Sequence, residues 1–252
     1  MRLLSVLPFF PLVFSAGLAL ADSPKPEALA EAFELVGIRL LCEQSAPLVA
    51  RGLPEAQQAR VNTIFAADGL CLGLARRVAP KLERAQLQQA EALLDSPLAR
   101  QFTQAERAVG ETGAEGLAAY RLQLRERPPR AERLALVRRL DRAAQTTAMA
   151  SLLRYEAGKT QLSLALEARG EHLDERALSA QTEAQGKALG TSSAEAVESF
   201  MLYAYRQMPS AQLAEYAALY EQEPVSRLLR ASVQALPALF AARRAKLTQV
   251  AP

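Results

Sequence analysis

The sequence is poor in the residues that mark strands and metal sites. Its 252 residues include no tryptophan, one histidine and two cysteines, and only 6% are aromatic. Runs of β-branched residues, which are typical of strands, are absent, so nothing in the sequence favours a β-sheet. The single imidazole, His172, does not make a zinc site, because such sites take three or four protein ligands. We therefore expect no sheet and no bound metal.

Short motifs of common catalytic machinery are also missing. The chain has no Gly-x-Ser-x-Gly and no Ser-x-x-Lys sequence. Its two cysteines lack the Cys-x-x-Cys spacing of redox sites. We therefore predict no catalytic residue, no cofactor and no enzymatic activity.

The N-terminus has the features of an export signal. An apolar run over residues 3–20, interrupted by two prolines, ends in the small-x-small pattern Ala19-Leu20-Ala21. A membrane anchor is the alternative, because the run approaches the length of a bilayer-spanning helix. The prolines and the polar residues that follow favour a signal peptide over residues 1–21. We therefore predict a periplasmic or secreted protein, cleaved near Ala21.

What the chain does contain is typical of helices. Half of its residues are hydrophobic, and alanine, leucine, arginine, glutamate and glutamine dominate. The fold class that this predicts is all-α, a multi-helix bundle. The formal net charge of +3 is too small to indicate a partner. Arginine supplies most of the basic residues, which fits either phosphate recognition or a GC-rich genome, and the predicted compartment disfavours nucleic acid.

One segment of the sequence occurs twice. The residues Ala85-Gln86-Leu87, Ala92-Leu93, Pro97 and Arg100 recur as Ala211-Gln212-Leu213, Ala218-Leu219, Pro224 and Arg227. Arg127-Pro128-Pro129-Arg130 separates the copies, since two prolines do not fit inside a helix. We therefore predict two related helical units, residues 22–127 and 128–252. The spacing between the copies grows along the chain, so we expect an insertion in the second unit, around the glycines of residues 158–190.

The hydrophobic periodicity and the proline positions predict where the helices lie. In the first unit they indicate helices over residues 27–50, 54–79, 82–94, 97–110 and 117–124. In the second unit they indicate a helix over 131–157, a looser glycine-containing region, a helix capped by Thr191-Ser192-Ser193, and helices from Pro209 and Pro224, the last kinked at Pro237.

The second copy carries a resemblance to a known group of proteins. Its residues Gln212-Leu213, Tyr216, Leu219-Tyr220 and Pro224-Val225 resemble those of exported all-helical proteobacterial proteins that are catalogued only as a domain of unknown function. The first copy departs from this pattern, with Leu93-Leu94 in place of the aromatic pair. The resemblance implies helices and an exported address, and it implies no activity and no site residues.

Two cysteines lie in neighbouring predicted helices. Cys42 and Cys71 are separated by a proline-marked turn, so antiparallel helices can bring them within disulfide distance. In an oxidising compartment such a pair is normally bridged. The alternative is two buried free thiols.

Two groups of residues are candidates for binding. Eight arginines over residues 121–142 can meet anionic lipid headgroups, lipopolysaccharide phosphates or an acidic protein, or can be solvated helix faces. They are Arg121, Arg125, Arg127, Arg130, Arg133, Arg138, Arg139 and Arg142. Later aromatic residues can line a cavity for an apolar ligand, or can be core. They are Phe200, Tyr203, Tyr216 and Tyr220.

One fragment is similar to an enzyme signature. Glu198-Ser199-Phe200, followed by Gln207-Met208-Pro209, resembles parts of the signature of soluble lytic transglycosylases, in which a buried glutamate is the general acid. The glycine-rich element between those parts is replaced here by residues 201–206.

Our leading hypothesis is an exported, non-catalytic envelope interaction or scaffold protein whose partner is an envelope protein. A carrier of a small apolar or amphipathic molecule is the alternative, and a peptidoglycan-active enzyme is third. A filled core with an exposed apolar patch favours the first hypothesis, whereas a large tyrosine-lined cavity favours the second.

Overall fold

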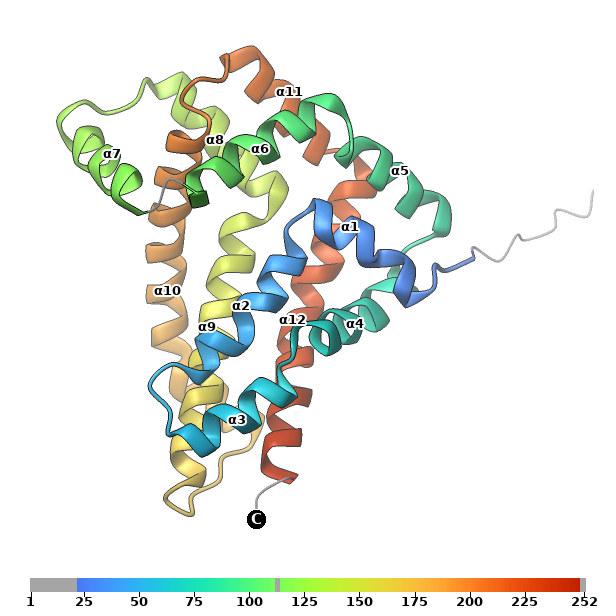
Figure 1. Ribbon diagram of the computed structural model, residues 1–252, viewed down its shortest axis with the longest axis vertical. Coiled ribbons are helices and arrows are strands. Elements are labelled where there is room, and N and C mark those ends of the chain that lie inside the picture. The colour runs from blue at the N-terminus through green and yellow to red at the C-terminus, as the bar shows by residue number, and fades with distance from the viewer. Residues whose placement is uncertain (1–21, 112–113, 250–252) are drawn as a thin grey trace, which may run out of the picture.

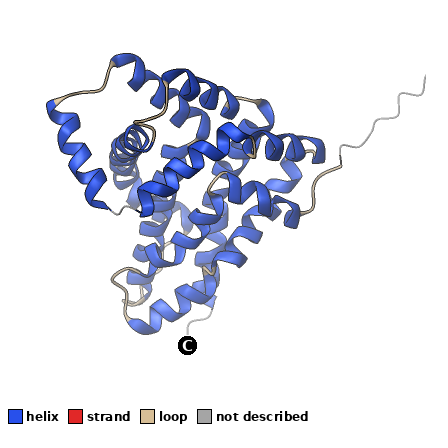
Figure 2. Ribbon diagram, turned by 45° about the horizontal axis from the view of Figure 1, so that its top comes forward, coloured by secondary structure: helices blue, strands red, loops and turns tan. Residues whose placement is uncertain are grey.

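The computed structural model describes residues 22–111 and 114–249, and these residues form helices and loops without a strand (Figures 1 and 2). This confirms the prediction of an all-α multi-helix bundle. The predicted signal peptide lies outside the described residues. Within the described ranges, no helix combines the length and hydropathy of a membrane span.

In chain order the α-helices are α1 (Ala30–Leu35), α2 (Ile38–Ala50), α3 (Glu55–Ile64), α4 (Ala67–Val78), α5 (Arg84–Leu94), α6 (Pro97–Glu111), α7 (Ala114–Glu126), α8 (Ala131–Ala144), α9 (Thr146–Glu167), α10 (Glu175–Ala204), α11 (Ser210–Tyr220) and α12 (Glu223–Gln249).

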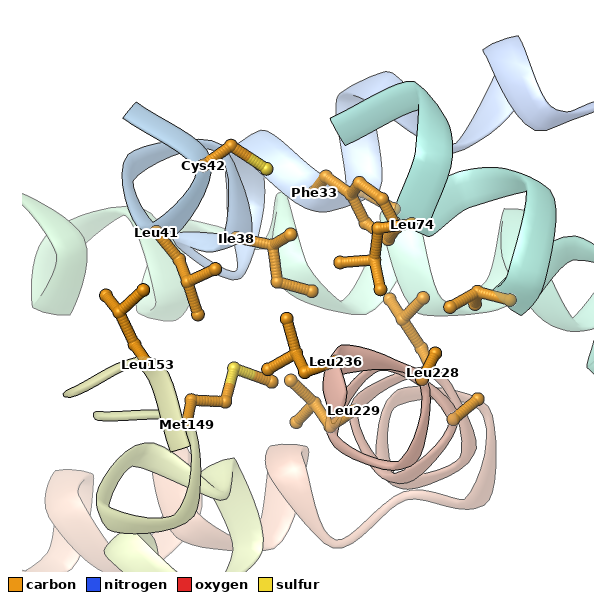
Figure 3. Close-up of a cluster of buried hydrophobic side chains, with 14 of the residues drawn as sticks. Phe33, Ile38, Leu41, Cys42, Leu74, Met149, Leu153, Leu228, Leu229 and Leu236 are labelled. Atoms are coloured by element: carbon orange, nitrogen blue, oxygen red, sulfur yellow. The ribbon is translucent and has the colours of Figure 1, made fainter. Parts of the chain in front are cut away.

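Helix α12 is the centre of the bundle (Figure 1). It packs against α3, α4 and α5 from the first half of the chain and against α9 from the second. Figure 3 shows side chains of α2, α4, α9 and α12 converging, among them Ile38, Leu74, Met149 and Leu236. The buried hydrophobic residues of both halves therefore form one continuous core.

The two sequence copies adopt the same local structure. In each copy two residues separate an 11-residue helix, α5 or α11, from the next helix, α6 or α12. In the first copy the Ser96 hydroxyl accepts a hydrogen bond from the Ala99 amide at 3.3 Å, which caps α6. The first helix of each corner packs against the second helix of the other, α5 on α12 and α11 on α6.

Three predicted helices are each divided in two. The expected helix over residues 27–50 breaks at Gly37, which takes φ +74°. The helix over 54–79 breaks at Phe65 and Ala66, between α3 and α4. The helix over 131–157 breaks at Gln145, a non-glycine residue at φ +56°, between α8 and α9.

The prediction of a loose region around residues 158–190 was wrong. Of it, only residues 168–174 form a loop, and Thr191-Ser192-Ser193 lies inside α10. Two of its glycines serve close packing, since a Cβ would lie 3.3 Å from Gln185 at Gly158 and 3.2 Å from the Tyr155 ring at Gly186. The cap of α10 is Asp174, whose carboxylate accepts the Ala177 amide at 2.7 Å.

The predicted cysteine pair is brought together. A disulfide joins Cys42 of α2 to Cys71 of α4, with 5.8 Å between their Cα atoms. An ion pair of 2.6 Å between Arg39 and Asp68 joins the same two helices.

Candidate functional site

The predicted aromatic residues of α11 lie in the core. Tyr216 is 2% exposed, and its ring stacks on Phe102 of α6 with 4.2 Å between centroids. Its hydroxyl lies 3.2 Å from that of Tyr220. Tyr205, at the end of α10, packs on Phe102 and donates a hydrogen bond to the Glu106 carboxylate. Burial raises the pKa of the Tyr205 and Tyr216 hydroxyls well above the ordinary value. These rings fill the space between α6 and α11.

The predicted aromatic residues of α10 have a different environment. Phe200 and Tyr203 are half-buried, and the Tyr203 ring lies 5.3 Å from that of Tyr120 in α7. A Cβ at Gly116 would collide with the Tyr203 hydroxyl, so this glycine lets α7 approach α10. Among the described residues, no ring contact joins Phe200 or Tyr203 to the α11 pair. The ring contacts therefore place Tyr203 beside α7 and Tyr216 beside α6.

Several of the predicted surface arginines have partners. Arg138 pairs with Glu198 at 2.7 Å, and Arg139 pairs with Glu221 through two nitrogens at 2.6 and 2.8 Å. The hydrogen bond from Arg139 lowers the pKa of Glu221, with a smaller effect from Arg142.

Two further arginines bind α10 and the residue that follows it. Arg121 of α7 donates to the Ser199 hydroxyl at 2.9 Å, and Arg133 of α8 donates to the Tyr205 backbone carbonyl. These arginines therefore hold α7 and α8 against the end of α10.

Of the four remaining arginines, three gather at one turn, and the fourth, Arg142, is exposed on α8. Arg125, Arg127 and Arg130 are exposed around the connection of α7 and α8, and make no ion pair with any residue in the described ranges. Leu122, one turn before them on α7, is 59% exposed and is one of the most exposed large hydrophobic residues. We call Leu122, Arg125, Arg127 and Arg130 the α7–α8 corner.

A groove of about 460 Å³ lies between α8 and α10, and Glu198 is one of its lining residues. Arg138, Asp141 and Arg142 line it as well. The Glu198 side chain is 32% exposed and ion-paired, whereas a glycosidase general acid sits in a cleft that favours its protonated form. None of the four predicted aromatic residues lines this groove.

A buried charge cluster was missed by the sequence analysis. It joins α9, α10 and α12 through Glu156, Lys159, Glu175 and Arg244, of which Glu156, Lys159 and Arg244 are at most 4% exposed. Arg244 lies 2.7 Å from Glu156 and 2.7 Å from Glu175, and Lys159 pairs with both carboxylates. Arg244 also donates to the Thr160 hydroxyl at 3.2 Å.

The two carboxyl groups of the cluster are shifted in opposite directions. Burial raises the pKa of Glu156, although Arg244 and Lys159 oppose it. Partial burial acts to raise the pKa of Glu175, but hydrogen bonds from Arg244 and Lys159 outweigh it and the pKa is lowered. A groove of about 360 Å³ runs beside the cluster, along Tyr155 and Pro237. The two cations balance the two carboxylates, so the cluster has no net charge and links α9, α10 and α12 through ion pairs.

His172 is exposed in the loop between α9 and α10. In the described part of the chain, no three His, Cys, Asp or Glu side chains are placed to hold a metal ion.

Comparison with known proteins gave no assignment: the chain matches no protein-family model, no curated protein and no solved structure. The resemblance to the exported helical family therefore stays a prediction.

Proposed function

We propose that this is an exported, non-catalytic interaction protein of the cell envelope, which binds an acidic partner protein through the α7–α8 corner. The observation that carries the proposal is the corner itself, where three exposed arginines, which form no ion pair with any described residue, lie next to an exposed leucine. Arginine is enriched at protein interfaces, where its planar fork binds carboxylates and its stem packs on apolar groups. Two other arginines of this region, Arg138 and Arg139, are already neutralised by ion pairs with glutamates of the same chain.

The aromatic packing supports this function over that of a carrier. A carrier of an apolar molecule needs an open space lined by the predicted residues. Tyr216 instead stacks on Phe102, the Tyr216 and Tyr220 rings contact each other, and their hydroxyls are hydrogen-bonded. The inter-helix space that the carrier hypothesis requires is occupied here by side chains.

The proposal is tested by site-specific photo-crosslinking in the cell of origin. A photoreactive residue replaces Leu122, and the control replaces Leu40 of α2, which is 55% exposed. We expect a defined protein adduct from position 122 alone, lost when Arg125 and Arg130 are both changed to glutamate. Equal labelling at both positions, or none at position 122, would contradict the proposal.

Native mass spectrometry of the protein purified from its own envelope tests the carrier directly. We expect the mass of the bare chain or of a protein complex. A reproducible excess mass of a small molecule, lost on denaturation, would replace the interaction hypothesis with the carrier.

A further inference from the structure

Two arginines meet at the contact of α4 with α12, away from the α7–α8 corner (Figure 1). Arg77, in the last turn of α4, donates a hydrogen bond to the Gly73 carbonyl at 2.9 Å. Arg243 of α12 donates to the Gly69 carbonyl, and its terminal nitrogen lies 3.3 Å from the position of a Cβ on Gly73. Both guanidinium groups therefore lie against Gly73 and are neighbours.

Within the part of the chain that the structure describes, no carboxylate neutralises this pair of arginines. Both residues are half-buried, and neither makes an ion pair within the described ranges. Asp68, which precedes Gly69, is 89% exposed and is paired with Arg39. Burial lowers the pKa of Arg243, and the charge of Arg77 lowers it further. Two like charges in a partly desolvated place repel each other, and this repulsion is relieved by an anion between them.

The free donors of the pair suit a tetrahedral oxyanion. A guanidinium group carries five N–H donors in a fixed fork, and one glycine carbonyl satisfies only one of them in each arginine. Gly69 and Gly73 lie one turn apart on α4 and carry no side chain, so the Arg243 guanidinium can lie close to the helix backbone. Two adjacent forks of this kind are a common arrangement for phosphate recognition.

We propose that Arg77 and Arg243 bind a phosphate group, either free phosphate or the phosphate of a lipid headgroup. The site is independent of the α7–α8 corner, because it lies on different helices and takes a different ligand.

The test compares the full mature chain with Arg77→Gln and Arg243→Gln, and uses Arg76→Gln as the control. Arg76 is the exposed neighbour of Arg77, so its replacement removes the same charge from the same helix. Binding of inorganic phosphate is measured by calorimetry and by the shift in melting temperature, against chloride at equal ionic strength. Vesicles of phosphatidylglycerol and of phosphatidylcholine, tested by co-sedimentation, form the lipid arm.

We expect phosphate to bind the wild type and the Arg76 variant, and to bind the Arg77 and Arg243 variants at least ~10-fold more weakly, the loss of a charge-assisted contact. In chloride, Arg77→Gln should not lower the melting temperature, because it removes a repulsion. Binding of phosphatidylglycerol vesicles that is lost in the same two variants identifies a lipid headgroup as the source, and phosphate binding without vesicle binding identifies free phosphate.

Three results would overturn the proposal. The first is that phosphate has no effect beyond that of chloride, and the second is that all variants bind it equally. The third is that Arg77→Gln destabilises the protein in chloride while phosphate binding is unchanged, since the side chains then serve packing alone. If Arg243→Gln does not fold, Arg77→Gln alone decides among these outcomes.

Discussion

Replacing Arg244 with methionine removes the central cation of the buried charge cluster. Methionine keeps a long, flexible side chain, so packing is disturbed little. Among the described residues, Glu156, which is 1% exposed, then keeps only Lys159 at 3.8 Å as a cationic partner. Removing one partner of a buried ion pair costs about 3–5 kcal/mol, because the other charge stays buried and uncompensated. In a protein of this size 1 kcal/mol shifts the melting temperature by about 2–4 °C, so we expect a loss of roughly 10 °C at neutral pH.

This loss should depend on pH in a defined direction. Burial already raises the pKa of Glu156 above the unfolded value of 4.5, and removing Arg244 raises it further. Between the unfolded and folded pKa values the folded variant holds a proton that the unfolded chain releases. Its stability relative to the wild type therefore falls as the pH rises through this window. We expect a larger loss at about pH 8 than at about pH 5.

Thermal melts followed by circular dichroism measure both effects. The double variant Glu156→Gln/Arg244→Met should recover part of the loss, because the amide carries no charge. The control Arg227→Met breaks an exposed pair with Glu223 at 2.9 Å and should change the melting temperature little, because solvent screens exposed ion pairs. A loss that is equal at both pH values and unrelieved in the double variant would refute the charge argument and leave packing as the cause.

Three further changes have defined outcomes. Reducing the disulfide between α2 and α4, which closes a loop of 29 residues, should lower stability by about 3–4 kcal/mol in melts with and without reductant. Gly116→Ala should loosen α7 by colliding with Tyr203 and speed its limited proteolysis, whereas Gly190→Ala, which meets no atom within 4 Å, should raise stability by about 0.5–1 kcal/mol. Because the pKa of Glu175 is lowered in the folded state, the stability that its ionised form contributes is lost as the pH falls below the unfolded value of 4.5. The stability of Glu175→Gln should therefore fall less steeply than that of the wild type over this acidic range. An unchanged melt in reductant, equal proteolysis of both glycine variants or an unchanged acid limb would each contradict the corresponding argument.

The prolines predicted helix boundaries correctly, and the cysteines predicted a contact between two helices. Pro97 begins α6, and the proline pair at residues 128–129 separates α7 from α8, because proline fixes a local geometry that needs no tertiary context. Cys42 and Cys71 were predicted to pair on compartment and spacing, and the structure places them together.

The glycines gave a wrong prediction of a loose region, because the structural role of a glycine depends on the helix that packs against it. Gly158 and Gly186 favour a loop in the sequence, yet both lie inside long helices, where a Cβ would meet Gln185 at 3.3 Å and Tyr155 at 3.2 Å. A glycine that serves close helix packing has the same local sequence signature as one that ends a helix. Only the partner helix distinguishes the two, and a single sequence does not reveal it.

Helical spacing in the sequence predicts the burial of three of the four charged residues in the cluster. Arg244 follows the buried Phe240 by four residues and precedes the buried Leu247 by three, so helical spacing places it on the inward face of α12. Glu156 and Lys159 are three residues apart on α9 and can be found in the same way. Their common partner Glu175 is not predictable, because the contact depends on the turn that returns α10 along α9.

The central place of α12 has a consequence for the order in which the chain becomes native. Phe65 and Phe240, whose ring centroids are 5.3 Å apart, are separated by 175 positions in the sequence. Helices α3, α4 and α5 are made long before α12, and the parts of their surfaces that contact α12 are covered only when this last helix is present. Until then the nascent chain exposes this hydrophobic surface. Aggregation or chaperone binding is therefore favoured in the interval between the synthesis of α5 and the release of α12 from the ribosome.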